Sequence, residues 1–153
     1  METLDLKYLT EAFLQNYRRR LHQAWEINAG DCFRWALLAC KLHGGQLYSV
    51  SLMIEDLDFI IPGTFKPDGT HAFIKIDNKY YDAETTEGVD DWEQLPYFKR
   101  IDFSQYTDSW WYEVREHTSV RSFKRFWRPT LITSRADRKL LRKIKDGQDK
   151  PAT

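Results

Sequence analysis

The chain has 153 residues, of which 42% are hydrophobic, 15% aromatic and 30% charged, with a formal net charge of zero. This composition excludes an intrinsically disordered chain, and we expect residues 1–153 to form a single domain with a real hydrophobic core. The start, METLDLKYLTEAF, carries three acidic residues where a secretory signal would need a basic start, and no stretch approaches the ~20 apolar residues of a membrane span. The expected location is the cytoplasm, with no membrane partner.

The first part of the chain is predicted to form two helices separated by a turn. Apolar residues at three- and four-residue spacing predict the first helix over residues 6–24. The segment EINAGD breaks this pattern, and a second helix is predicted over about 31–43, with Asp31 or Gly30 as its cap and a Gly-Gly pair at its end. Cys32 is therefore expected in the first turn of the second helix.

After the Gly-Gly pair the sequence becomes rich in branched and aromatic residues, which predicts β-strands. Five such segments begin at positions 46, 58, 71, 79 and 98: QLYSVSLMI, DFIIPG, HAFIKI, KYYDAE and FKRIDFS. A mostly antiparallel sheet is expected. Residues 109–129 suggest a strand and then a short helix stopped by Pro129, and Ser134 is expected to cap a basic C-terminal helix over about 134–146. The predicted fold class is α+β.

Cys32 stands where a helix favours a thiolate. The unpaired N–H groups and the positive end of the helix dipole both favour negative charge there, and a lowered pKa would make the thiol reactive near neutral pH. The alternative is a buried filler, which free cysteines often are. Cys40 lies two turns deeper among small residues and is expected to be such a filler. Two cysteines about 12 Å apart on one helix cannot form a disulfide, which needs Cα atoms within roughly 7 Å.

The segment HAFIKIDNKYYDAET predicts a hairpin with its turn at residues 77–78. This register places Phe73 opposite Asp82 and His71 opposite Glu84, all on one face. A catalytic imidazole needs a neighbouring carboxylate to fix its tautomer and stabilise the imidazolium, and both Asp82 and Glu84 are candidates. The other face collects an apolar set: Ala72, Ile74, Tyr81 and Ala83.

The order of GDC at a helix start, HAF on a strand and YDAET a hairpin later resembles the transglutaminase-like branch of the papain-like cysteine enzymes, over roughly residues 29–88. In that branch, HAW and a DPT-like segment carry the His and Asp; here Ala83 replaces the proline, which has no chemical role. The resemblance implies Cys32 as nucleophile, His71 as general base and then acid, and Asp82 as the residue that orients His71. It also implies a Cys-bearing helix packed on an antiparallel sheet, to which this chain adds N- and C-terminal helices.

The second donor of an oxyanion hole, besides the backbone N–H of Cys32, is left open between Gln23, Trp25 and Asn28. Asn28 is favoured because it lies in the loop that leads into the second helix.

A metal site would use the same residues as the triad. Cys32, His71 and Asp82 could supply three zinc ligands, but the chain has no CxxC or HxxxH pair and no fourth ligand at a typical spacing. We expect no metal and no cofactor. The remaining histidines are interpreted as surface or packing residues: His22, His43 and His117.

Charge is unevenly distributed along the chain. Residues 115–145 contain eleven Lys and Arg against two acidic residues, while the rest contains twelve basic and twenty-one acidic residues. This asymmetry indicates either an anionic partner for the C-terminal segment or its docking on the acidic body. The aromatic residues interleaved with these cations would suit single-stranded nucleic acid or sugar, although small domains more often bury such rings in their core.

The expected function is a cysteine-dependent acyl-transfer enzyme acting on a protein or peptide. Hydrolysis by a protease, peptide amidase or deamidase is favoured over crosslinking, because so small a chain has little room for a separate acceptor-amine site. The alternative is a non-catalytic adaptor of the same fold that binds an anionic protein or nucleic acid through its basic, aromatic C-terminal third.

Overall fold

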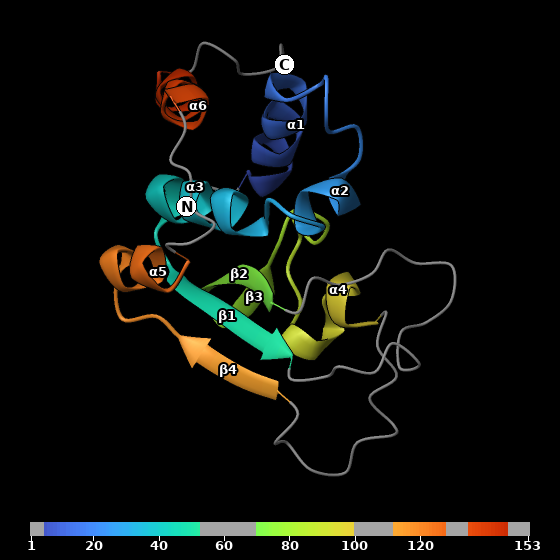
Figure 1. The fold of residues 1–153 in the computed structure, drawn as a ribbon, viewed down its shortest axis with the longest axis vertical. Helices are drawn as coiled ribbons and strands as arrows, with labels where there is room; N and C mark the ends of the chain where they lie inside the picture. Colours follow the sequence, from blue (N-terminus) through green and yellow to red (C-terminus); the bar gives the residue numbers. More distant parts are fainter. Residues whose placement is uncertain (1–4, 53–69, 100–111, 128–134, 147–153) are drawn as a thin grey trace.

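The computed structural model describes residues 5–52, 70–99, 112–127 and 135–146 (Figure 1). These residues form an α+β structure built around a four-stranded antiparallel sheet. The strands are β1 Gln46–Leu52, β2 Thr70–Ile76, β3 Lys79–Tyr81 and β4 Tyr112–Glu116, in the spatial order β3-β2-β1-β4. The helices are α1 Leu6–Asn16, α2 Ala24–Asn28, α3 Cys32–His43, α4 Pro96–Lys99, α5 Val120–Phe126 and α6 Arg135–Lys145, with a 3₁₀ turn, η2, at Trp92–Gln94. Among these residues, no helix combines the length and apolar character needed to cross a membrane.

The two faces of the sheet are both covered by apolar side chains. One face carries Leu47, Ala72 and Ile74, which join a core built with α1 and α3. The other face carries Tyr48, Val50 and Phe73, which form a second cluster with Leu95, between η2 and α4, and with Tyr97 and Phe98 of α4. This alternation follows the two-residue period of a strand, so neighbouring residues of β2 enter different cores.

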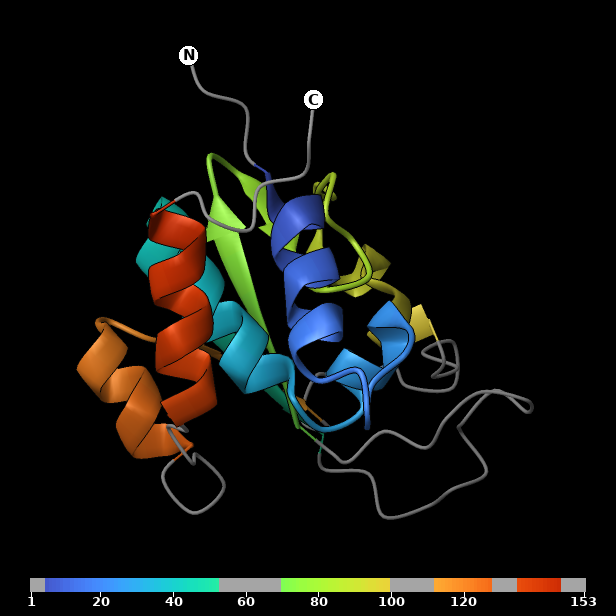
Figure 2. The ribbon, with the colours of Figure 1, turned by 90° about the horizontal axis from the view of Figure 1, so that it is seen from above.

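Helix α3 is the central helix. It lies on β1 and β2 and also contacts α1 and α6, so that these two helices form a second layer over it (Figures 1 and 2). Its predicted span is confirmed: Asp31 is the N-cap residue, and Gly44 ends the helix with a positive φ of 77°, which glycine adopts without strain. Cys32 is the first residue of the helix.

The predicted hairpin is confirmed in its turn and its first three pairs. Asp77 and Asn78 both have positive φ, which gives the turn type that matches strand twist in two-residue hairpins. Ile76 pairs with Lys79, and Ile74 pairs with Tyr81. The strand then ends, so the expected pairing of Phe73 with Asp82 and of His71 with Glu84 does not form.

The first helix is shorter than predicted. It ends at Asn16, and the N–H groups of Arg20 and Leu21 both donate to the carbonyl of Tyr17, which turns the chain back and buries Leu21 in the core. A new helix, α2, begins after Gln23, whose side chain and that of Glu26 form a capping box. The EINAGD segment therefore starts as helix, contrary to the prediction of a turn there.

The later elements agree with the sequence in part. The strand and short helix expected after residue 109 are β4 and α5, and the basic helix is α6. The prediction of a strand beginning at Phe98 is wrong at its start, because Phe98 and Lys99 belong to α4. The segment DFIIPG and the cap Ser134 lie outside the described residues.

Candidate active site

The thiol of Cys32 lies against the edge of the sheet. β3 ends at Tyr81, so the pair of Ile74 with Tyr81 is the last one on that side of β2. Hydrogen-bonding direction alternates along an antiparallel strand, so Ala72 points its N–H to the same side as Ile74, where β3 has already ended. This N–H donates to Sγ of Cys32 at 3.4 Å. The early end of β3 thus leaves a backbone donor for the sulfur.

Two features of this position favour a thiolate. Cys32 is at the N-terminus of α3, where backbone N–H groups and the helix dipole stabilise negative charge. The Ala72 amide adds a donor that is directed at the sulfur. Burial acts in the opposite direction, because a charged sulfur loses its hydration, and Cys32 has 2% of its surface exposed. Neither cysteine forms a disulfide.

His71 and Asp82 form a buried hydrogen-bonded pair. Nε2 of His71 lies 3.0 Å from Oδ2 of Asp82, and both side chains are almost fully enclosed. The other carboxylate oxygen of Asp82 accepts hydrogen bonds from the backbone N–H groups of Glu84 and Thr85, at 3.0 and 2.9 Å. Asp82, rather than Glu84, is therefore the partner of His71, and its own orientation is fixed by the turn that follows β3.

The pair determines the tautomer of His71. Because a carboxylate oxygen accepts at Nε2, the proton of the neutral ring resides there and Nδ1 is left as the acceptor. Nδ1 is buried and has no hydrogen-bond partner within the described structure. The amide nitrogen that donates to Cys32 belongs to Ala72, the next residue, so the sulfur lies against the backbone of β2 directly after His71. Within the described structure, no hydrogen bond joins Nδ1 of His71 to the sulfur.

Tyr97 holds the imidazole in place. Its ring stacks on that of His71 with centroids 4.2 Å apart and planes 6° from parallel, and Phe98 makes an edge contact with the same ring. No pattern in the sequence indicates a role for Tyr97. The one signal that could have found it is the cluster of aromatic residues in YF at 97–98, after the hairpin.

The three candidate oxyanion donors lie in different places. Asn28, the last residue of α2, is fully buried, and its Nδ2 donates to Glu84 at 3.0 Å, which connects it to the turn that orients Asp82. Trp25 and Gln23 bond to each other at the exposed start of α2. The structure thus associates only Asn28 with the buried site, and one N–H of its amide remains beyond the bond to Glu84.

The carboxylate of Asp31, next to Cys32, is neutralised by two arginines. Arg20 binds it at 2.7 Å and Arg34 at 2.8 Å. Arg34 also binds Asp137 of α6 through two nitrogens, and Tyr17 contacts that same carboxylate. Burial alone would lower the pKa of Arg34, but its hydrogen bond and attraction to Asp137 raise it well above the usual value. The negative charge of Asp31 would oppose a thiolate at Cys32, and the two arginines compensate that charge.

A second buried histidine lies in the core under α5. Nε2 of His117 is 2.8 Å from Oγ of Ser49, and Trp127 donates its Nε1–H to the same oxygen at 2.9 Å. Burial, with a smaller effect of Arg115, lowers the pKa of His117 to about 4. Ser49 of β1 is thus bonded to His117, which follows β4, and to Trp127, which follows α5. This agrees with the interpretation of His117 as a packing residue.

The described residues contain no group of three or more His, Cys, Asp or Glu side chains placed to hold a metal ion. The comparisons with protein-family models, with curated proteins and with solved structures give no match for this chain.

Proposed function

We propose that the chain is a cysteine-dependent acyl-transfer enzyme, related in its site to the transglutaminase-like branch of the papain-like enzymes, that hydrolyses an amide bond in a protein or peptide. The observation that carries the proposal is the buried His71–Asp82 pair directly before the Ala72 amide that donates to the thiol of Cys32. A helix-terminal thiol, an imidazole with one nitrogen left as acceptor and an oriented carboxylate are together the parts that nucleophilic catalysis needs.

The proposed reaction has two halves, and in each of them His71 takes up one proton and then returns it. Nδ1 of His71 takes the proton of the Cys32 thiol, and the thiolate attacks the carbonyl carbon to form the C–S bond. The oxyanion accepts hydrogen bonds from the first turn of α3 and from Nδ2 of Asn28. The C–N bond then breaks as His71 returns the proton to the leaving amine. Water, deprotonated by His71, attacks the thioester, and the departing sulfur recovers that proton.

Asp82 has a positioning role in this scheme. Its hydrogen bond at Nε2 leaves Nδ1 of the ring to accept the thiol proton and stabilises the imidazolium after proton transfer. The stack of Tyr97 on the ring prevents rotation away from the thiol. Hydrolysis is favoured over transfer to an amine because of the size of the chain, as argued above.

The test is the rate of alkylation of Cys32 by iodoacetamide as a function of pH, followed by mass spectrometry of the modified peptide. Because the midpoint of the profile is independent of how easily the reagent enters, it reports thiolate formation even at a buried sulfur. We expect a midpoint well below the ~8.5 of a free thiol, and we expect His71→Ala to move it upward.

Cys40 is the internal control in the same samples. Partial burial raises the pKa of its thiol, and the adjacent Lys41 opposes this only in part, so it should react at higher pH in every variant. A midpoint for Cys32 that equals that of Cys40, or that ignores His71, would contradict the proposal. Accumulation of an acetyl-enzyme from p-nitrophenyl acetate in wild type, and its absence in Cys32→Ala, would establish the acyl step.

A further inference from the structure

The helix α6 docks through its apolar side and leaves its cations in solvent. Leu140 is buried, and Leu141 and Ile144 are partly buried against the core. The one acidic residue of the helix, Asp137, is turned inward to Arg34. Among the described residues, the basic segment therefore docks by apolar contacts and the ion pair of Asp137 with Arg34, and no acidic residue of the body is paired with its cations.

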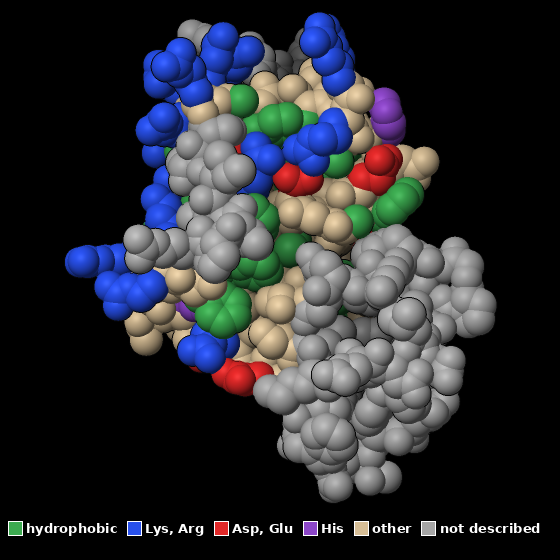
Figure 3. Space-filling view, in the orientation of Figure 1, with side chains coloured by type: hydrophobic (Ala, Val, Ile, Leu, Met, Phe, Trp, Pro, Cys, Tyr) green, Lys and Arg blue, Asp and Glu red, His purple; other side chains and the backbone are tan. Residues whose placement is uncertain are grey.

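The cations of α6 are continued by residues of two other helices. Arg138 and Lys145 lie near Lys41 of α3 and Lys124 of α5. Partial burial lowers the pKa of Lys41, and the positive charges of these three neighbours lower it further. Figure 3 shows Lys and Arg side chains gathered over α6 and α5 along one flank of the molecule. We call this surface the cationic face. Within the described ranges, none of these four side chains forms an ion pair.

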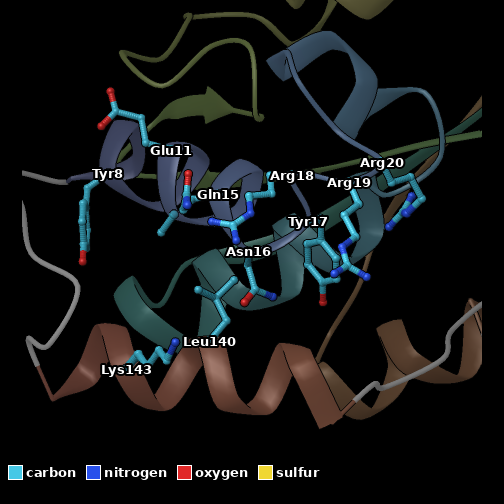
Figure 4. A pocket seen from close by; sticks show the side chains of 11 residues that line it. Tyr8, Glu11, Gln15, Asn16, Tyr17, Arg18, Arg19, Arg20, Leu140 and Lys143 are labelled. Atoms are coloured by element: carbon cyan, nitrogen blue, oxygen red, sulfur yellow. The ribbon is translucent and has the colours of Figure 1, made fainter.

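On the other side of α6 the cationic face extends into a groove of about 900 Å³. Arg18 and Arg19, which follow α1, form one wall, and Lys143 of α6 forms the other (Figure 4). The amides of Gln15 and Asn16 lie between them. Glu11 also lines the groove, but its carboxylate points away from the two arginines (Figure 4). Cations thus line both sides of one helix.

We propose that the cationic face binds double-stranded nucleic acid through its phosphates, independently of the chemistry proposed for Cys32. Dense, unpaired cations supply the sequence-independent part of such binding, and side-chain amides are common partners of phosphate oxygens. A protein interface would instead be centred on aromatic or apolar anchors. The large apolar side chains exposed in the described structure, Trp25 of α2 and Val114 of β4, belong to elements outside this face.

Two other anionic partners fit less well. A helix that lies on a membrane inserts its apolar side, but that side of α6 is already packed on the core. Single-stranded nucleic acid is bound by stacking its bases on exposed aromatic rings. The described part of the groove is lined by Tyr8, which is buried, and by Tyr17, which is half-buried and has Arg20 and Arg34 over its ring. Double-stranded nucleic acid presents a regular row of phosphates, which the cations of this face can bind without any aromatic ring.

The experiment measures binding of the full-length protein to a short, fluorescently labelled DNA duplex of mixed sequence by anisotropy, over a series of KCl concentrations. The test variant is Arg138→Gln with Lys145→Gln, both exposed positions of a helix that glutamine tolerates. The matched control is Lys75→Gln with Lys79→Gln in the β2–β3 hairpin, which changes the net charge equally. Thermal unfolding checks that both variants fold.

We expect wild-type affinity to fall steeply with salt, and the test variant to bind roughly thirtyfold more weakly near ~0.15 M salt, with the slope of log K against log [KCl] reduced by about two. The control and Cys32→Ala should bind like wild type. Absence of duplex binding, an equal loss in the control, or tighter binding to an acidic protein or to vesicles rich in phosphatidylserine would overturn the proposal. Loss of duplex binding leaves the alkylation profile of Cys32 unaffected, so the two proposals fail separately.

Discussion

His117 should make the stability of the protein depend on pH below neutrality. Burial first, and then the charge of Arg115, lowers the pKa of this imidazole to about 4, whereas an unfolded chain titrates histidine near ~6.5. The unfolded state therefore binds a proton more readily throughout this interval. The contribution of the neutral, buried ring is complete above pH ~6.5 and is lost as the pH falls towards ~4.

The size of the effect follows from the separation of the two pKa values, about 2.5, which corresponds to about 3 kcal/mol in total. Integration of the linkage relation gives a loss of about 2 kcal/mol between pH ~7 and ~5. The variant His117→Gln removes the titration and retains a polar side chain beside Ser49. Urea unfolding followed by tryptophan fluorescence, repeated over a pH series, measures the free energy of unfolding for both proteins.

The stability advantage of wild type over His117→Gln should shrink by about 2 kcal/mol from pH ~7 to ~5, because other titrating groups cancel in the difference. His22→Gln, which replaces an exposed histidine, is the matched control and should leave the pH dependence unchanged. Parallel curves for wild type and His117→Gln would refute the argument that the ring is buried in its neutral form.

Three further substitutions test the packing that supports the site. Arg34→Met should cost about 3 kcal/mol in urea unfolding, because it leaves the carboxylate of α6 buried without its cation, and a loss no larger than that of the exposed Arg115→Met would contradict this. Asn78→Val should lower the melting temperature by the equivalent of about 1 kcal/mol, since a branched residue is strained at φ 69°, and Asn78→Gly should not. Gly45→Ala places a Cβ 2.7 Å from a backbone carbonyl of β2 at φ 98° and should destabilise by more than about 1 kcal/mol; an equal effect of Gly30→Ala, where the space is open, would count against that reasoning.

The parts predicted well from sequence are those with local signals. The span of α3 follows from its cap residues and the Gly-Gly pair, and the register of the hairpin follows from the two residues of its turn and the alternation around it. Both signals lie within a few residues of what they determine. The faces of β2 were also predicted, and Ala72 and Ile74 do enter the core under α3.

The parts that were missed depend on contacts between distant residues. The choice between Asp82 and Glu84 is made where β3 ends, which depends on the backbone bonds that Asp82 receives from the next turn. Tyr97 reaches His71 from α4, and Ser49 reaches His117 across 68 positions. Such pairs have no periodicity or spacing that a single sequence displays.

The hairpin between β2 and β3 has a consequence for the order in which the site assembles. His71 and Asp82 are only 11 positions apart, so their contact needs little more than closure of one tight turn. The sulfur of Cys32 meets the amide of Ala72 across 40 positions and does so only when α3 docks on the sheet. Contacts of long sequence separation are entropically costly and form late in folding. The thiol of Cys32 therefore joins the His71–Asp82 pair last, and a nascent or partly unfolded chain carries an ordinary thiol until the core has closed.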